Sequence, residues 1–316
     1  MSTGYHIRYL RRHEIDAEQW DHCVHNAPNG WLYLQSFFLD GLGPWDALVA
    51  TPADTPTATA YSYIMPLPKK KKWIFWYCPV PPFVGQLGIV GPAPVSPGLV
   101  DDFLKHLPPA FILADLLLNE QNPAPSLPGV DLRIRTNYVL PLAMDYSTLY
   151  SEYTPDAQKN LRRAARAGLR PISNVPVEKV ITLYRAAYGS KSDFLSAADY
   201  VRIAAISAEC IKRKKGFTLG ITDGQNNLCA AAFFGIDEKR IYYLLGAPSE
   251  EGRRHSAVHL LIDEVIKRYA GSALQLDFEG SDIPSVAAFY RKFNPERQSY
   301  PLVRISRLPR WLLKPL

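Results

Sequence analysis

The sequence has few cysteines and no long apolar run, and each absence argues against a class of protein. Its four cysteines lie far apart and form no Cys-x-x-Cys pair. This spacing does not fit a disulfide-rich secreted scaffold, and small buried thiols in a reducing compartment are expected instead. No segment approaches the roughly 18 apolar residues that a membrane-spanning helix needs. The first residues lack the apolar core of a secretory signal, so we expect a soluble, cytoplasmic chain.

Signatures of several enzyme classes are also missing. The sequence contains no Gly-x-Ser-x-Gly and no Walker-type loop, which weighs against a serine hydrolase or a nucleoside triphosphatase. Gly85–Gly88 does not complete a Gly-x-Gly-x-x-Gly dinucleotide fingerprint. His255, His259 and Asp263 recur at four-residue spacing, but no His-Glu-x-x-His pattern accompanies them. We therefore predict no metal site.

What is present is a globular composition with an uneven charge distribution. The chain has 316 residues, of which 47% are hydrophobic, so two domains are expected, 1–153 and 154–316. Residues 1–155 contain 10 Lys and Arg against 14 Asp and Glu, whereas residues 156–316 contain 26 against 16. The basic second half favours a partner that bears phosphate or carboxylate groups.

Hydrophobic periodicity predicts alternating helices and strands. In the first half, helices are predicted at 14–27, 30–39 and 99–106, and strands at 45–50, 57–67, 73–80, 111–118 and 133–142. In the second half, helices are predicted at 154–167, 196–214 and 256–269, and strands at 217–222, 228–236, 240–245 and 274–278. The pattern indicates an α/β fold built around a mixed sheet. Lys69–Lys72 is interpreted as a solvated hairpin turn.

The helix that follows Thr154-Pro155 carries a basic stripe. Four basic side chains recur at spacings of three and four: Lys159, Arg162, Arg163 and Arg166. Guanidinium groups offer paired donors to phosphate and carboxylate oxygens, so the stripe could bind an anionic substrate. A solvated helix face is the alternative.

Residues 246–256 join a strand to a helix and form a second candidate site. Backbone amides at a helix N-terminus attract anions, and arginines add positive charge. The residues predicted to bind a cofactor phosphate here are Gly246, Gly252, Arg253, Arg254, His255 and Ser256. An ordinary surface loop remains the alternative, because Glu250 and Glu251 oppose a pyrophosphate.

A third candidate site lies near the C-terminus. Asp277 and Glu279 alternate with apolar residues, which predicts two carboxylates on one face of a strand. Tyr290 follows on a helix and could return a proton to a leaving group. The predicted catalytic residues are Tyr290, Asp277 and Glu279, although a tyrosine with no catalytic role is the more frequent case.

Three segments resemble a known family. Gly85–Ile89, Lys159–Gly168, and Asp277–Ser281 with Phe289–Phe293 look like the Fem-type aminoacyltransferases, the methicillin-resistance factors that add amino acids to peptidoglycan precursors. The resemblance implies two tandem GNAT-like domains, each a mixed β-sheet flanked by helices, with the last 15 or so residues returning to pack on the first domain. Phe289-Tyr290-Arg-Lys292 also resembles the Leu-Tyr-x-Lys segment of acetyltransferases, which implies that Tyr290 is the general acid.

The combined interpretation is transfer of an acyl or aminoacyl group to a primary amine, with the substrate between the domains. The donor is left open between acyl-CoA and aminoacyl-tRNA, and the acceptor between an anionic small molecule and a cell-wall precursor. Two main alternatives remain: an acetyltransferase unconnected with the cell wall, and a catalytically silent module that binds an anionic ligand. A nucleic-acid binder is a weaker third option. Transfer RNA would be a partner if it carries the aminoacyl group.

Overall fold

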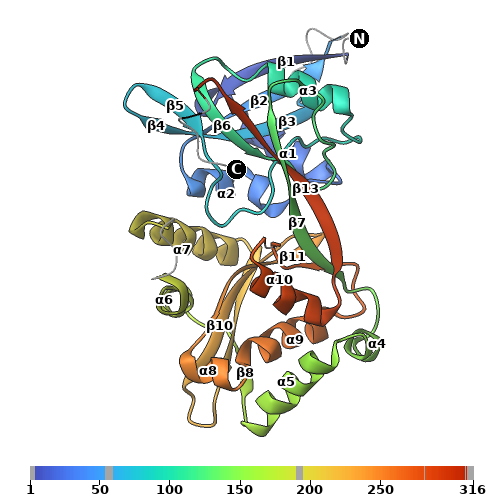
Figure 1. Ribbon diagram of the computed structural model, residues 1–316, viewed down its shortest axis with the longest axis vertical. Helices are drawn as coiled ribbons and strands as arrows, with labels where there is room; N and C mark the ends of the chain where they lie inside the picture. Colours follow the sequence, from blue (N-terminus) through green and yellow to red (C-terminus); the bar gives the residue numbers. More distant parts are fainter. Residues whose placement is uncertain (1–3, 54–59, 190–194, 281, 310, 312–316) are drawn as a thin grey trace. The chain divides into compact units, whose positions relative to one another are not determined.

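The computed structural model describes residues 4–53, 60–189, 195–280, 282–309 and 311, and these divide into two compact units (Figure 1). Unit 1 contains the described residues up to Arg135 and those from Ser299 onward, and unit 2 contains Thr136–Gln298. The C-terminal residues after Ser299 thus group with the first part of the chain. The domain boundary at 153/154 stays a prediction; the compact units divide earlier along the chain.

Unit 1 contains two groups of hydrogen-bonded strands. Strands β1 (Tyr5–Arg11), β2 (Trp45–Pro52) and β3 (Tyr63–Pro68) form an antiparallel sheet in that order. Strands β4 (Lys70–Lys72), β5 (Phe75–Cys78), β6 (Phe111–Leu117) and β13 (Glu296–Ser306) follow one another in the second. The helices are α1 (Ala17–Asn26), α2 (Ser36–Leu42) and α3 (Pro97–Lys105). Apolar residues of α3 and of both strand groups share one core.

The Gly85–Ile89 segment of the family resemblance is a buried polar loop within unit 1. Gly88 has φ +80°, and a Cβ there would lie 2.2 Å from Asn122 Oδ1. The same oxygen accepts a hydrogen bond of 2.8 Å from the Ile89 backbone. Gln86 is buried and bonds with both the backbone and the side chain of Glu120. The glycine therefore allows a close approach that fixes the loop.

Unit 2 is built on six neighbouring strands of a mixed sheet, with helices on both faces. Its strands, in spatial order, are β7 (Asp131–Pro141), β12 (Gln275–Asp277), β11 (Arg240–Pro248), β10 (Leu228–Ile236), β9 (Gly216–Thr222) and β8 (Arg170–Ser173). Helices α6 (Val177–Tyr188) and α7 (Ala197–Lys212) pack on one face. Helices α5 (Pro155–Arg166) and α9 (Ala257–Tyr269) cover the other. The remaining helices are α4 (Tyr146–Ser151), α8 (Glu250–Arg254) and α10 (Pro284–Tyr290).

Local sequence signals explain the helices that were predicted. Thr154 caps α5 by accepting a hydrogen bond from the Ala157 amide at 3.3 Å, and Pro155 occupies the first turn. Ser196 and Asp199 form a reciprocal capping box at the start of α7. The predicted mixed α/β class with helices flanking a mixed sheet is confirmed.

Several elements differ from the sequence prediction. Lys70–Lys72 form strand β4, and the hairpin turn is Trp73-Ile74, so the interpretation of the lysines as the turn is wrong. The predicted helix at 30–39 is a 3₁₀ turn at Leu32–Leu34 followed by α2. Residues 57–59 of one predicted strand lie outside the described residues. Strands β1, β8 and β13 and helices α4 and α6 were not predicted.

Candidate active site

The candidate site lies where two parallel strands of unit 2 stop pairing. Strands β11 and β12 pair through three positions, the last of which joins Tyr242 to Asp277. Strand β12 ends there, while β11 continues to Pro248. Within the described chain, β11 therefore has no parallel partner beyond Tyr242, and its amides and carbonyls are available to other groups on that side.

Tyrosine side chains surround this point. The rings of Tyr243 and Tyr290 lie 6.4 Å apart and nearly perpendicular, and Tyr138 lies 6.5 Å from Tyr290. Tyr184 and Tyr188 of α6, themselves 5.2 Å apart, are close enough to affect the pKa of both central tyrosines. The strand end is thus bordered by aromatic rings that carry hydroxyl groups.

Tyr290 has the properties of a proton donor. Burial, followed by the nearby charge of Glu279, raises its pKa well above the ordinary value of a tyrosine. Its ring packs 4.9 Å from that of Phe278, and no described residue hydrogen-bonds to its hydroxyl. The side chain is therefore held by apolar contacts, stays protonated near neutral pH and keeps its hydroxyl available. Its catalytic role stays a prediction.

Glu279 lies beyond the end of β12 in an unusual backbone conformation. Its φ is 62°, and Gly280 follows with φ 61°. A Cβ at residue 280 would lie 2.2 Å from the carbonyl oxygen of Thr136, so only glycine fits there. The expectation that Asp277 and Glu279 share one strand face is wrong, because the strand ends before Glu279. The charge of Glu279, which follows β12 in this left-handed turn, adds to the effect of burial in raising the pKa of Tyr290.

Asp277 is fully buried and fully engaged. Its Oδ2 lies 2.8 Å from Arg240 Nη1 and accepts a hydrogen bond of 3.2 Å from Asn137 Nδ2. Its Oδ1 accepts a hydrogen bond of 2.8 Å from the Glu279 amide. These contacts link β11, β12, β7 and the Glu279 turn, so Asp277 positions the site. The catalytic role of Asp277 stays a prediction.

The two glycines of the 246–256 loop allow close packing. A Cβ at Gly246 would lie 2.0 Å from the Tyr243 hydroxyl, and one at Gly252 would lie 1.7 Å from the Cys229 carbonyl oxygen. Ser249 caps the short helix α8 by accepting a hydrogen bond of 3.0 Å from the Gly252 amide. The glycines therefore make room for the Tyr243 ring and for α8 on β10.

The polar residues of the same loop have different surroundings. Arg254 pairs with Glu250 at 2.6 Å and with Glu251 at 3.2 Å, and His255 pairs with Glu251 at 2.8 Å. Ser256 adopts φ 62° and donates a hydrogen bond of 2.8 Å to Asn160 Oδ1 on α5. Arg253 is exposed, and burial raises the pKa of Tyr188 although the charge of Arg253 opposes that rise. Of the predicted phosphate ligands, Arg253 thus lies beside the tyrosine cluster; the cofactor role of the whole loop stays a prediction.

The basic stripe of α5 is exposed along its length. Lys159, Arg162, Arg163 and Arg166 all point away from the core, while Ala157, Asn160, Leu161 and Ala164 form the buried face. No acidic partner of the four is found within the described part of the chain. Lys292, two residues after Tyr290, instead pairs with Asp156 at 2.7 Å. The stripe therefore carries positive charge on the outside of unit 2; its binding role stays a prediction.

His259 and Asp263 of α9 have separate partners. Asp263 accepts hydrogen bonds of 3.0 Å from the hydroxyls of Tyr146 and Tyr153. His259 packs edge-on against Phe289 with ring centroids 4.9 Å apart, and burial lowers its pKa to about 4. Across the described residues, no group of three His, Cys, Asp or Glu side chains could hold a metal ion.

We predict that His259 makes the protein less stable at acid pH. Its pKa of about 4 lies below the ordinary value of 6.5, so the unfolded chain takes up the proton first as the pH falls. The contribution of neutral His259 to the free energy of unfolding is fully present above pH 6.5. This contribution is lost as the pH falls towards 4, and the loss is on the order of 3 kcal/mol. Urea unfolding of the wild type and of His259→Phe at pH 7, 5.5 and 4 checks this. The variant should lose less stability over this range; equal losses would contradict the prediction.

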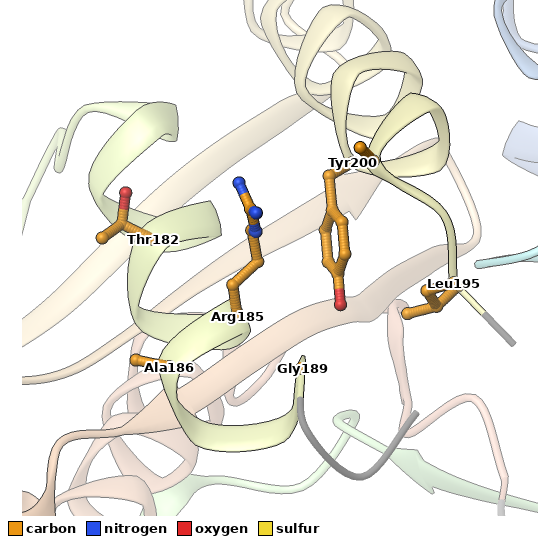
Figure 2. Close-up of a pocket in the computed structure, with 7 residues that line it drawn as sticks. Thr182, Arg185, Ala186, Gly189, Leu195 and Tyr200 are labelled. Atoms are coloured by element: carbon orange, nitrogen blue, oxygen red, sulfur yellow. The ribbon is translucent and has the colours of Figure 1, made fainter. Parts of the chain in front are cut away.

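A pocket of about 540 Å³ lies between α6 and α7 (Figure 2). Thr182, Arg185 and Ala186 of α6 line one side, and Tyr200 of α7 lines the other. The Arg185 guanidinium lies 5.2 Å from the centre of the Tyr200 ring, a cation–π contact. Sequence reasoning missed this pocket because α6 was not predicted, although Val177, Val180, Ile181 and Tyr184 follow a helical spacing.

Comparison with known proteins identifies the fold. No family model and no curated protein sequence matches the chain. Among solved structures, FemX is similar at a TM-score of 0.63 with 12% identity, over 93% of this chain and 96% of that chain. L-PGS from Bacillus licheniformis is similar at 0.53 with 12% identity, over 94% and 93%. A conserved protein of unknown function from Bacteroides thetaiotaomicron is similar at 0.57 with 10% identity, over 94% and 99%.

These likenesses extend over nearly the whole chain and define its fold. The chain shares the fold of FemX and of L-PGS, and the resemblance inferred from its sequence segments is confirmed at the level of the fold. Ser281 of the third segment lies outside the described residues. No helix among those described is both long enough and apolar enough to cross a bilayer.

Proposed function

We propose that the protein transfers an acyl or aminoacyl group to a primary amine, with Tyr290 as general acid. The observation that carries this proposal is a buried, protonated tyrosine with an available hydroxyl at the point where β11 and β12 part. Acyl transfer needs such a donor because the leaving group departs as an anion. The Fem-type fold supports the same chemistry.

The proposed reaction has two proton transfers. The amine attacks the acyl carbon, a C–N bond forms, and the bond from that carbon to the leaving sulfur or oxygen breaks. Tyr290 gives its proton to the departing group, and the Glu279 carboxylate takes one from the amine. Transfer of that proton from Glu279 to Tyr290 would then restore the general acid. Unpaired amides of β11 beyond Tyr242 would hold the developing oxyanion.

Binding of the substrates rests on the basic residues. Lys159, Arg162, Arg163 and Arg166 would hold an acceptor that carries phosphate or carboxylate groups, such as a cell-wall precursor. Arg253 and the 246–256 loop would hold the donor. Because Arg254 and His255 already pair with acidic side chains, Arg253 would supply most of the charge of this loop.

The donor is decided by calorimetry with acetyl-CoA and, separately, with charged transfer RNA. An acyl-CoA enzyme should bind acetyl-CoA, and an aminoacyltransferase should bind the charged transfer RNA. Arg253→Ser should lower the affinity for whichever donor binds. Arg202→Ser, which changes an exposed arginine on α7, is the control. Binding of neither donor at millimolar concentration would contradict the proposed transfer and leave the silent anion-binding module, which the engaged Arg254 and His255 favour.

A further inference from the structure

The β4–β5 hairpin of unit 1 exposes three apolar side chains in a row. Trp73 and Ile74 form its turn and are 84% and 77% exposed, and Phe75 follows at 44%. Figure 1 shows the hairpin, in cyan, reaching out from the body of unit 1. A contiguous apolar patch at a projecting tip marks a surface that is covered by a partner.

Lysines border this apolar tip. Lys70, Lys71 and Lys72 make up β4 and are all exposed, and no described acidic side chain pairs with them. The ammonium groups of Lys69 and Lys71 lie 5.3 and 5.5 Å from the ring centre of Trp76 on β5. The hairpin thus combines uncompensated positive charge with aromatic and aliphatic side chains.

Protection of a sheet edge explains only part of this arrangement. Strand β4 is at the end of its sheet, and edge lysines discourage pairing with another chain. That purpose does not call for Trp73, Ile74 and Phe75 at the tip. Trp73 also has φ 57°, a conformation in which glycine or asparagine is usual and a bulky residue is rare. The apolar tip therefore needs a separate explanation.

We propose that this hairpin docks the protein on an anionic lipid bilayer. Trp73, Ile74 and Phe75 would insert at the boundary between headgroups and acyl chains, where tryptophan is favoured. Lys70, Lys71 and Lys72 would lie over negatively charged headgroups. A bilayer is favoured over a folded partner because the exposed apolar tip projects from unit 1 and is bordered by three exposed lysines, a combination that suits insertion between anionic headgroups.

The charge requirement is tested by sedimentation of the full chain with vesicles. Vesicles of phosphatidylcholine and phosphatidylglycerol at 3:1 should bind at least tenfold more tightly than phosphatidylcholine alone, and higher salt should weaken the binding. Each lysine near an anionic surface changes the partition coefficient about fivefold. The triple variant Lys70→Ser/Lys71→Ser/Lys72→Ser should therefore partition into the 3:1 vesicles roughly a hundredfold less than the wild type. The control variant Lys105→Ser/Lys179→Ser/Lys212→Ser removes the same charge from other exposed positions, and its partitioning into the vesicles should change little.

The apolar requirement is tested by Trp73→Ser/Ile74→Ser. Partitioning into the 3:1 vesicles should fall more than tenfold, because the inserted side chains are gone while the lysines remain. Val201→Ser/Ile211→Ser on α7 removes exposed apolar side chains elsewhere and should change nothing. All four positions are exposed, so circular dichroism should show unchanged folding.

Three results would overturn the proposal: vesicle binding that survives both hairpin variants, equal loss in the control variants, or binding to polyglutamate or RNA with none to vesicles. Transfer to a small water-soluble amine should be unaffected in the hairpin variants. Vesicle binding therefore tests the docking proposal, and transfer to a soluble amine tests the proposed reaction independently of it.

Discussion

Replacing Tyr290 with phenylalanine is expected to slow turnover by about ten- to a hundredfold while leaving donor binding unchanged. The phenyl ring keeps the contacts with Phe278 and Tyr243 but cannot donate a proton to the leaving group. Steady-state rates with saturating donor and amine measure the effect. Because the loss is confined to the chemical step, kcat should fall while KM stays close to its original value.

Tyr269→Phe is the matched control for Tyr290→Phe. Tyr269 is half-buried, packs on Phe217, and lies on α9 away from the end of β12. Its variant should retain the rate. The raised pKa of Tyr290 also predicts that turnover of the wild type does not fall through loss of the Tyr290 proton below pH 10. An unchanged kcat in Tyr290→Phe would remove this residue from the mechanism.

Replacing Asp277 with alanine is expected to cost about 3–5 kcal/mol of unfolding free energy, because it leaves the Arg240 charge buried without its partner. Urea unfolding monitored by circular dichroism measures the change. The loss should far exceed that of an exposed carboxylate variant such as Glu209→Ala, whose partners are solvated.

Arg240→Met/Asp277→Leu separates the missing charge from the missing packing. With both charges removed and similar volumes kept, the double variant should recover part of the stability lost in Asp277→Ala. Recovery should be incomplete, because the Asn137 side chain and the Glu279 amide lose their acceptor. Equal stability of Asp277→Ala and the wild type would show that the ion pair contributes nothing to the fold.

Local signals made much of the fold predictable. The Thr154 cap, the capping box of Ser196 and the apolar periodicity of β9 to β11 are each encoded within a few residues. Helix α6 has no such start, because its N-cap is Pro176, which has no side chain that can accept a hydrogen bond. The sequence prediction put the turn of the β4–β5 hairpin at Lys69–Lys72, four residues before Trp73-Ile74. A run of charged residues is typical of a solvated turn, whereas two large apolar residues are not.

The candidate site was only partly predictable. Tyr290 could be found from its neighbours in sequence, but its environment depends on residues from distant elements, such as Tyr243 and Tyr188. The position of Glu279 follows from a left-handed turn that alternation along a strand does not reveal. Gly246 and Gly252 were predicted as phosphate-loop residues, and only the structure shows the atoms that their missing side chains would meet.

The path of the chain through its units has a consequence for biosynthesis. Strand β6 of unit 1 pairs with Leu302–Ser306 of β13, whereas unit 2 is one continuous stretch from Thr136 to Gln298. All of unit 2 is synthesised before Leu302–Ser306, so the sheet of unit 1 lacks a strand until the last part of the chain has been made. Unit 1 is therefore begun first and completed last, and shortening the chain to residue 298 would damage the unit that was made at the start.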